Sequence, residues 1–184
     1  MTSSHDDAAC EVAHGAAQGL AAAQGLAAAP ADAKVLVAVF ATPVAEFLLR
    51  YGTDAGYRPV LVEPDPERGK AAAQQAGAEL AAAVADYGDA ADVVVTDHHR
   101  PELGLMLRDA LASPARWVGI MGNPRHEGPH VAALTELGVP AGEIGRVHRP
   151  IGINIGSRTP AEIAIATLAG LIADRNGKPG GFAF

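Results

Sequence analysis

Apolar and polar positions follow two alternating patterns along most of the chain. Short continuous runs of branched apolar residues recur. After most of these runs comes a segment whose apolar residues repeat every three or four positions. Continuous runs are typical of strands buried on both faces, and the longer period is typical of helices that cover them. The pattern predicts strands at residues 35–40, 59–62, 92–96 and 116–121, with a candidate short strand at 146–148.

The helical segments lie between and after these runs. Prolines and acidic residues open several of them, and glycines follow their ends, as expected for helix termini. The last helix is apolar almost all round, so we expect it to be largely buried. Segment 78–91 is alanine-rich and stays open between strand and helix. The expected helices span about residues 44–55, 66–76, 103–111, 130–137 and 160–176.

This alternation predicts an α/β protein with a Rossmann-like three-layer fold and a mostly parallel sheet. In such sheets ligands bind beyond the carboxyl ends of the strands. Most of the unusual polar residues of this sequence fall in loops expected at that edge. These loops are residues 41–43, 63–66, 96–100, 122–128 and, if the short strand forms, 150–159.

The segment from Pro150 to Glu162 combines glycines with a strong helix start. Thr159 is placed as an N-cap, Pro160 takes the first helical position, and Glu162 completes a capping box. Two interpretations stay open. The segment is either a tight loop that leads into a helix, or an anion or cofactor site built on glycine backbone and free helix amides.

Composition limits the function classes. The 184 residues predict one domain at 34–184, preceded by a low-complexity extension at 1–33 in which Ala-Ala-Gln-Gly-Leu-Ala occurs twice. A net charge of −7 argues against nucleic-acid binding. There is no apolar run long enough to cross a membrane and no secretory signal. Cys10 is the only cysteine, which excludes an internal disulfide, and we expect a cytoplasmic location.

Two kinds of site are weighed and disfavoured. Glu63 stands where a dinucleotide-binding fold places the acid that reads a ribose, but the first turn, 40–45, lacks the glycine fingerprint. NAD(P) is therefore the weaker cofactor hypothesis. The histidines match no standard zinc spacing, and adjacent His98 and His99 are expected to point apart, so no metal site is predicted.

The favoured site is a pocket for an oxyanion or phosphate, built from the 122–126 and 152–159 loops. Arg125 and Arg158 offer forked contacts to phosphate, and hydroxyl and amide groups offer neutral hydrogen bonds. The candidate cofactor-binding residues are Thr96, Asp97, His98, Gly122, Asn123, Arg125, Gly152, Asn154, Gly156, Ser157 and Thr159. Catalytic residues are not assigned.

Three stretches resemble the C-terminal Rossmann domain of the XdhC/CoxI family. They are residues 117–125, 130–138 and 144–167, and the last of them is the most specific. The sequence departs from the family pattern at two places. Residues 40–44 replace a glycine-containing first turn, and Asn123 and Pro124 replace a serine and an arginine. The family's separate N-terminal domain, with its expected cysteine, is absent.

The resemblance implies an accessory protein that binds molybdenum cofactor (molybdopterin) and helps insert it into a xanthine or carbon monoxide dehydrogenase. The implied partners are a molybdenum hydroxylase subunit and a separate chain of the N-terminal type, and a homo-oligomer is also expected. Turnover chemistry is not implied. An NAD(P)-linked oxidoreductase and a non-catalytic interaction module are the alternatives.

Overall fold

The computed structural model describes residues 34–122 and 128–181. Its strands are β1 (Lys34–Val39), β2 (Tyr57–Val62), β3 (Glu79–Ala81), β4 (Ala91–Val95) and β5 (Trp117–Ile120). Its helices are α2 (Pro43–Asp54), α3 (Pro66–Ala76), α4 (Leu103–Ala112), α5 (Pro129–Glu136), α6 (Ala141–Ile144) and α7 (Pro160–Arg175). The expected extension at 1–33 lies outside the described residues.

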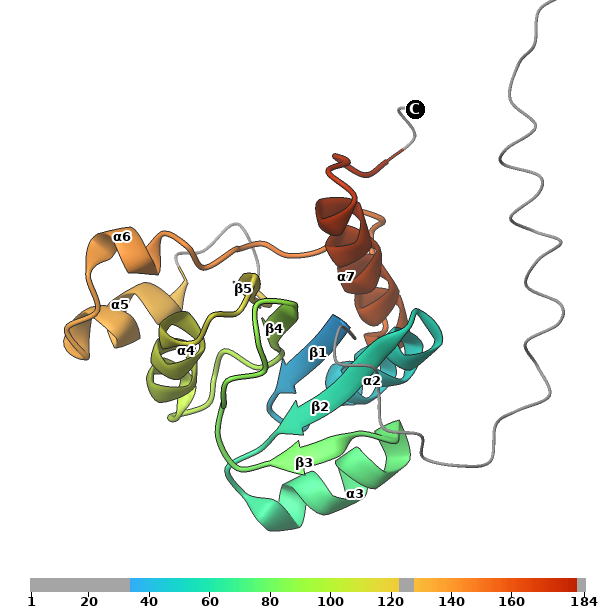
Figure 1. Cartoon of the computed structure of the whole chain (residues 1–184), viewed down its shortest axis with the longest axis horizontal. Helices are drawn as coiled ribbons and strands as arrows, with labels where there is room; N and C mark the ends of the chain where they lie inside the picture. Colours follow the sequence, from blue (N-terminus) through green and yellow to red (C-terminus); the bar gives the residue numbers. More distant parts are fainter. Residues whose placement is uncertain (1–33, 123–127, 182–184) are drawn as a thin grey trace, which may run out of the picture. The chain divides into compact units, whose positions relative to one another are not determined.

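The strands form one five-stranded sheet in the order β3-β2-β1-β4-β5 (Figure 1). Every pairing in it is parallel, as right-handed strand–helix–strand units require. His148 adds one parallel bridge outside β5 and exchanges backbone hydrogen bonds with Val118 and Ile120. The candidate strand at 146–148 therefore exists as a single bridge, and it delivers the 149–159 segment to the carboxyl edge of the sheet.

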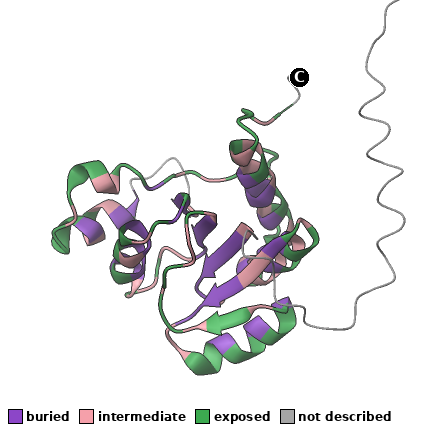
Figure 2. Cartoon of the chain, in the orientation of Figure 1, coloured by how far each residue is buried: buried purple, intermediate pink, exposed green. Residues whose placement is uncertain are grey.

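Alternate residues of the strands enter two separate hydrophobic cores. On one face, Val35, Val37 and Val39 pack with α4 and with Leu134 of α5. On the other face, Leu36 and Ala38 pack with α2, α3 and α7. Figure 2 shows the buried strands between these helices. The three-layer α/β fold predicted from the sequence is confirmed, and the sheet is parallel throughout.

The structure differs from the sequence-based expectation at three places. Segment 78–91 contains the short edge strand β3, and the short helix α6 was not predicted. The expectation that α7 is largely buried is wrong, because Ile165 is 50% exposed and Ile172 is 37% exposed. Helix α7 is an outer layer: one side packs on α2 and the sheet, and its apolar residues on the other side face outward.

The capping box at the start of α7 is confirmed. The Thr159 hydroxyl accepts a hydrogen bond from the Glu162 amide, and the Glu162 carboxylate accepts one from the Thr159 amide. We expect Thr159→Ala to lower the free energy of unfolding by about 1 kcal/mol, because one helix amide loses its partner. Urea denaturation measures this. An unchanged midpoint would show that the cap contributes nothing here.

Candidate functional site

The first strand–helix turn, where a dinucleotide fold binds pyrophosphate, is closed by internal hydrogen bonds. Thr42 accepts from the Ala45 amide and donates to Thr96, and Thr96 donates to the carbonyls of Val39 and Phe40. Thr96, a predicted cofactor-binding residue, is buried, and its hydroxyl takes part in these internal hydrogen bonds. The described residues of this turn therefore do not favour a phosphate ligand there.

Phe40, at the start of this turn, takes a backbone shape that is usual for glycine. Its φ of 75° lies in the left-handed region, which is uncommon for a bulky residue. Its ring is fully buried, and the Arg100 guanidinium lies over it, 4.7 Å from the ring centroid. The aromatic ring thus fills the space beside this turn.

Glu63 stands at the end of β2, where the sequence analysis considered a ribose ligand. Its side chain is fully buried, and each carboxylate oxygen accepts two hydrogen bonds. One oxygen binds the Ala41 amide at 2.9 Å and Arg100 at 3.1 Å; the other binds the Asp65 amide at 3.1 Å and Arg100 at 2.9 Å. Because a carboxylate has about four acceptor positions, none remains for a ribose hydroxyl.

The pKa of Glu63 reflects two opposing effects. Burial raises it, but the hydrogen bonds from Arg100 and from the amides of Ala41 and Asp65 outweigh burial and lower it below the ordinary value. The carboxylate is therefore charged at neutral pH and is held in place as a structural ion pair between β2 and the loop after β4.

At the opposite end of this edge, Gly122 meets Arg149. A side-chain carbon at Gly122 would lie 2.5 Å from Arg149 Nε, so a larger residue there would displace the guanidinium from this position. Arg149 directly follows the bridge residue His148, and Gly122 follows β5. Gly122 opens the first of the two glycine-bearing loops that the sequence analysis paired, whereas Arg149 precedes the second, so the meeting of the two loops themselves stays a prediction.

His98 and Asp97 extend this cluster from the loop after β4. Burial lowers the pKa of His98, and the charges of His99 and Arg149 lower it further, against the opposing effect of Asp97 and of a hydrogen bond to the Met121 backbone. Asp97 accepts from the His99 amide at 2.9 Å. The rings of His98 and His99 lie 4.0 Å apart, so the expectation that they point apart is wrong.

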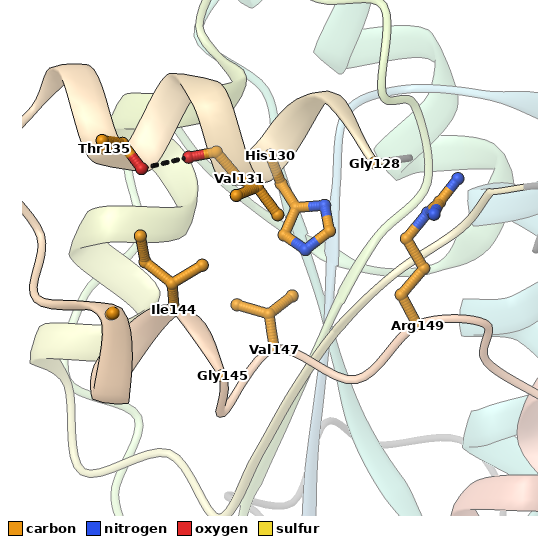
Figure 3. A pocket seen from close by; sticks show the side chains of 9 residues that line it. Gly128, His130, Val131, Thr135, Ile144, Gly145, Val147 and Arg149 are labelled. Atoms are coloured by element: carbon orange, nitrogen blue, oxygen red, sulfur yellow. Dashed lines mark hydrogen bonds between the residues drawn. The ribbon is translucent and has the colours of Figure 1, made fainter. Parts of the chain in front are cut away.

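His130 is the residue near Arg149 that the sequence analysis least suggested. It lies on the first turn of α5, is 7% exposed, and its Nδ1 has no hydrogen-bond partner among the described residues. Burial and the charge of Arg149 lower its pKa, so the imidazole is neutral at pH 7. Figure 3 shows its ring beside Val147, in a pocket of about 460 Å³. We call His98, Gly122, Gly128, His130 and Arg149 the Arg149 cluster.

The predicted role of Gly152 in approaching a ligand does not fit its position. Its φ is 84°, and a side-chain carbon there would lie 3.0 Å from the backbone of Ala166 and Thr167. The next residue, Ile153, donates its amide to the Ala166 carbonyl at 3.1 Å. Gly152 therefore allows the loop to pack directly on α7.

The helix start of α7 does not offer the free amides that the anion hypothesis needs. The Glu162 carboxylate accepts from the amides of Arg158 at 2.7 Å and Thr159 at 3.0 Å. These bonds lower the pKa of Glu162, which keeps it an anion at this position. The chain's own carboxylate thus occupies the place expected for an external anion.

The other candidate residues are either bonded internally, exposed, or outside the described residues. Ser157 donates to the Glu162 carbonyl at 3.3 Å, whereas Asn154 and Gly156 are exposed. Asn123 and Arg125 lie outside the described residues. The structure brings His98 and Gly122 together with Arg149 and His130. Arg149 was not predicted, and only its position after the candidate strand and before Pro150 could have drawn attention to it.

Comparison with known families decides the identity of the domain. Residues 36–171 match the family described as the XdhC Rossmann domain. The chain belongs to this family. The resemblance seen in the sequence is therefore confirmed, and the match runs from the third residue of β1 to α7, apart from the last turn of that helix.

Two known proteins are similar to this XdhC domain. The uncharacterized protein YqeB of Escherichia coli (strain K12) is 39% identical over 71 residues, which cover 39% of this chain and 13% of YqeB. A Bacillus halodurans structure described as a xanthine dehydrogenase (BH1974) is 21% identical with a TM-score of 0.61, covering 79% of this chain and 45% of that one. At that identity the likeness shows the fold. The chain spans less than half the length of either protein.

The described part of the XdhC domain also bears on metal binding, membrane spanning and assembly. It holds no group of three or more His, Cys, Asp or Glu side chains that could share a metal ion. No helix within residues 34–122 or 128–181 has the length and apolar character needed to span a bilayer. A groove of about 430 Å³ lined by Tyr51, Leu168 and three other apolar residues runs along α2 and α7, and the expected homo-oligomer stays a prediction.

Proposed function

We propose that this XdhC domain is part of an accessory protein for a xanthine dehydrogenase-type molybdenum enzyme. Its task in this proposal is to hold molybdenum cofactor as cargo at the Arg149 cluster. Membership of the XdhC family supports the accessory role. The observation that carries the site is the meeting of Arg149 with Gly122 at the carboxyl edge of a parallel sheet, where ligands of such folds bind.

The chemistry of the cluster suits the phosphate end of that cargo. Arg149 supplies a guanidinium, whose planar fork matches a phosphate, and Gly122 leaves the backbone open beside it. Neutral histidines at 98 and 130 supply hydrogen bonds without excess charge. The fit extends to the phosphate and to hydrogen bonds with the attached ring system.

The described residues offer no thiol for the metal end of the cargo. The only cysteine in the sequence is Cys10, which lies outside the described residues. We therefore propose that a second chain, either a separate N-terminal-type chain or the hydroxylase subunit, contacts the molybdenum while this domain holds the phosphate. An NAD(P)-linked activity is less well supported, because Glu63 is saturated by internal hydrogen bonds.

The test is direct binding of the cargo. We expect titration calorimetry with molybdenum cofactor, released anaerobically from a purified hydroxylase, to show binding to the full chain. Arg149→Gln should weaken it about tenfold to a hundredfold, because a charged hydrogen bond to phosphate contributes roughly 1.5–3 kcal/mol. Circular dichroism verifies that the variant is folded.

The matched control is Arg108→Gln, which removes an arginine on the exposed side of α4 that pairs with Asp109. It should bind the cofactor as the unchanged chain does. Equal binding by Arg149→Gln and the unchanged chain would refute the proposed site. Absence of cofactor binding, together with saturable binding of NADH, would refute the proposed function.

A further inference from the structure

An apolar groove runs between α2 and α7, on the outer side of both helices. It has a volume of about 430 Å³ and is lined by Tyr51, Ile165, Leu168, Ala169 and Ile172. Ile165 and Ile172 are exposed, although isoleucine is among the residues most often buried in folded proteins. Contiguous apolar surface of this kind marks an interaction site. The shape and charge of the surrounding face indicate what binds there.

The two helices of this face run in the same direction. Helix α2 directly follows β1 and leads back to the start of β2, so it runs from the carboxyl edge of the sheet to the amino edge. Helix α7 ends at the amino edge too, where Arg175 donates to Asp92 of β4 at 2.8 Å. The helices lie side by side in Figure 1 and share one hydrophobic core. Because Tyr51 and Leu168 line the same groove, the middle of α2 lies level with the middle of α7.

The outer side of α7 is shaped to receive a second, antiparallel α7. Ile165 and Ile172 are two helical turns apart, about 10 Å, and the small side chain of Ala169 leaves a notch between them. The two isoleucines stand symmetrically about the pair Leu168 and Ala169. A twofold axis at this level places Ile172 of a second copy beside Ile165 of the first, and the reverse contact is identical. Such self-complementarity is what an interface between two identical chains requires.

The charges on α2 fit the same arrangement. Arg50 and Asp54 are exposed and stand symmetrically about Gly52, next to Tyr51 of the groove. The Arg50 guanidinium lies over the rings of Phe47 and Tyr51, 5.1 Å and 5.9 Å from their centroids. The twofold axis that pairs the isoleucines also brings Arg50 of each copy opposite Asp54 of the other. Opposite charges at the rim of an interface fix its register and exclude arrangements that place like charges together.

We infer that the face formed by α2 and α7 binds a second copy of this chain, with the two α7 helices antiparallel and Arg50 of each copy opposite Asp54 of the other. The pair does not rest on the proposed function, since no residue of the Arg149 cluster lines the groove. Each α7 begins at the carboxyl edge of its sheet, so antiparallel helices direct the two carboxyl edges away from each other. The pair thus leaves each carboxyl edge clear of the other copy.

The experiment measures the oligomeric state of the full chain by sedimentation velocity, from about 1 to about 100 µM. A reducing agent excludes a dimer linked through Cys10. We expect a dimer whose share rises with concentration. Ile165→Glu should raise its dissociation constant about tenfold or more, because the variant places a charge in an apolar contact. The matched control is Leu105→Glu, which should dimerise as the unchanged chain does: Leu105 is 43% exposed on α4, which packs on the other face of the sheet.

A charge exchange tests the register of the two copies. Arg50→Glu and Asp54→Arg should each weaken the dimer about tenfold or more, because each places like charges opposite one another at both symmetry-related contacts. The double variant, Arg50→Glu with Asp54→Arg, should restore the dimer. Circular dichroism verifies that every variant is folded.

Three outcomes would overturn the inference. A full chain that stays monomeric would assign the groove to another segment of this chain or to an unlike partner. A dimer that Ile165→Glu leaves unchanged, or that Leu105→Glu weakens as much, would use a different surface. A double charge variant as weak as the single ones would show that Arg50 and Asp54 do not face each other across the twofold axis.

Discussion

Replacing Glu63 by Gln should lower the free energy of unfolding by about 3 kcal/mol or more. The carboxylate is fully buried and binds both nitrogens of the Arg100 fork, while Arg100 is itself largely buried. Removing one member of a buried pair costs about 3–5 kcal/mol, and Glu102, 3.3 Å from Arg100 Nε, would compensate only part of the remaining charge. Urea denaturation at neutral pH measures the loss.

The matched control is Glu67→Gln. Glu67 pairs with Lys70 on the surface of α3, with side chains 80% and 67% exposed. Such pairs contribute roughly 0–1 kcal/mol, so the control should change stability little. Comparable effects of Glu63→Gln and Glu67→Gln would contradict the structural role assigned to the buried pair.

Acid should remove the contribution of Glu63. Its pKa is lower in the folded chain than in the unfolded chain, where it is about 4.3. The stabilisation is therefore present above that value and is lost as the pH falls through the folded-state pKa. The stability of Glu63→Gln should depend less on pH in the acidic range than that of the unchanged chain.

The second large effect is expected at Gly152. Alanine there must adopt a φ of 84° and place its Cβ 3.0 Å from the backbone of α7. Left-handed strain costs about 1–2 kcal/mol, and forcing apart packed backbone costs about 1–3 kcal/mol more. We expect Gly152→Ala to destabilise the domain by roughly 2–5 kcal/mol in urea denaturation.

Gly156→Ala separates the two causes. Gly156 has a similar φ of 69°, but a Cβ there meets nothing within 4 Å. This variant should therefore show only the strain, about 1–2 kcal/mol. If both variants lost the same stability, close packing of Gly152 on α7 would not be the reason for a glycine at that position.

The sequence was informative wherever a local pattern determined the structure. The branched apolar run at β1 and the capping box at Thr159 and Glu162 each depend on neighbouring residues, and both are confirmed. Edge strand β3 has three residues and no buried face, so it carries little apolar signal. For α7, the apolar pattern correctly indicated a helix but could not tell which of its sides packs on the sheet.

The site was less predictable because it depends on contacts between distant residues. Glu63 and Arg100 are 37 residues apart. The sequence contains several arginines, and no local pattern shows which of them pairs with this carboxylate. The importance of Arg149 follows from its contact with Gly122, which needs the bridge at His148 to exist. Two glycines of these loops also differ in their surroundings: Gly122 lies against the Arg149 side chain, whereas Gly152 lies against the backbone of α7.

The packing around β5 supplies an optical probe of this edge. Trp117, the only tryptophan of the sequence, stacks on the His148 ring at 4.8 Å and nearly parallel to it, across Gly119. Detachment of the bridge would remove the imidazole from the indole and admit water beside it. The emission of one native fluorophore therefore reports, without labelling, whether the segment that carries Arg149 is seated on the sheet.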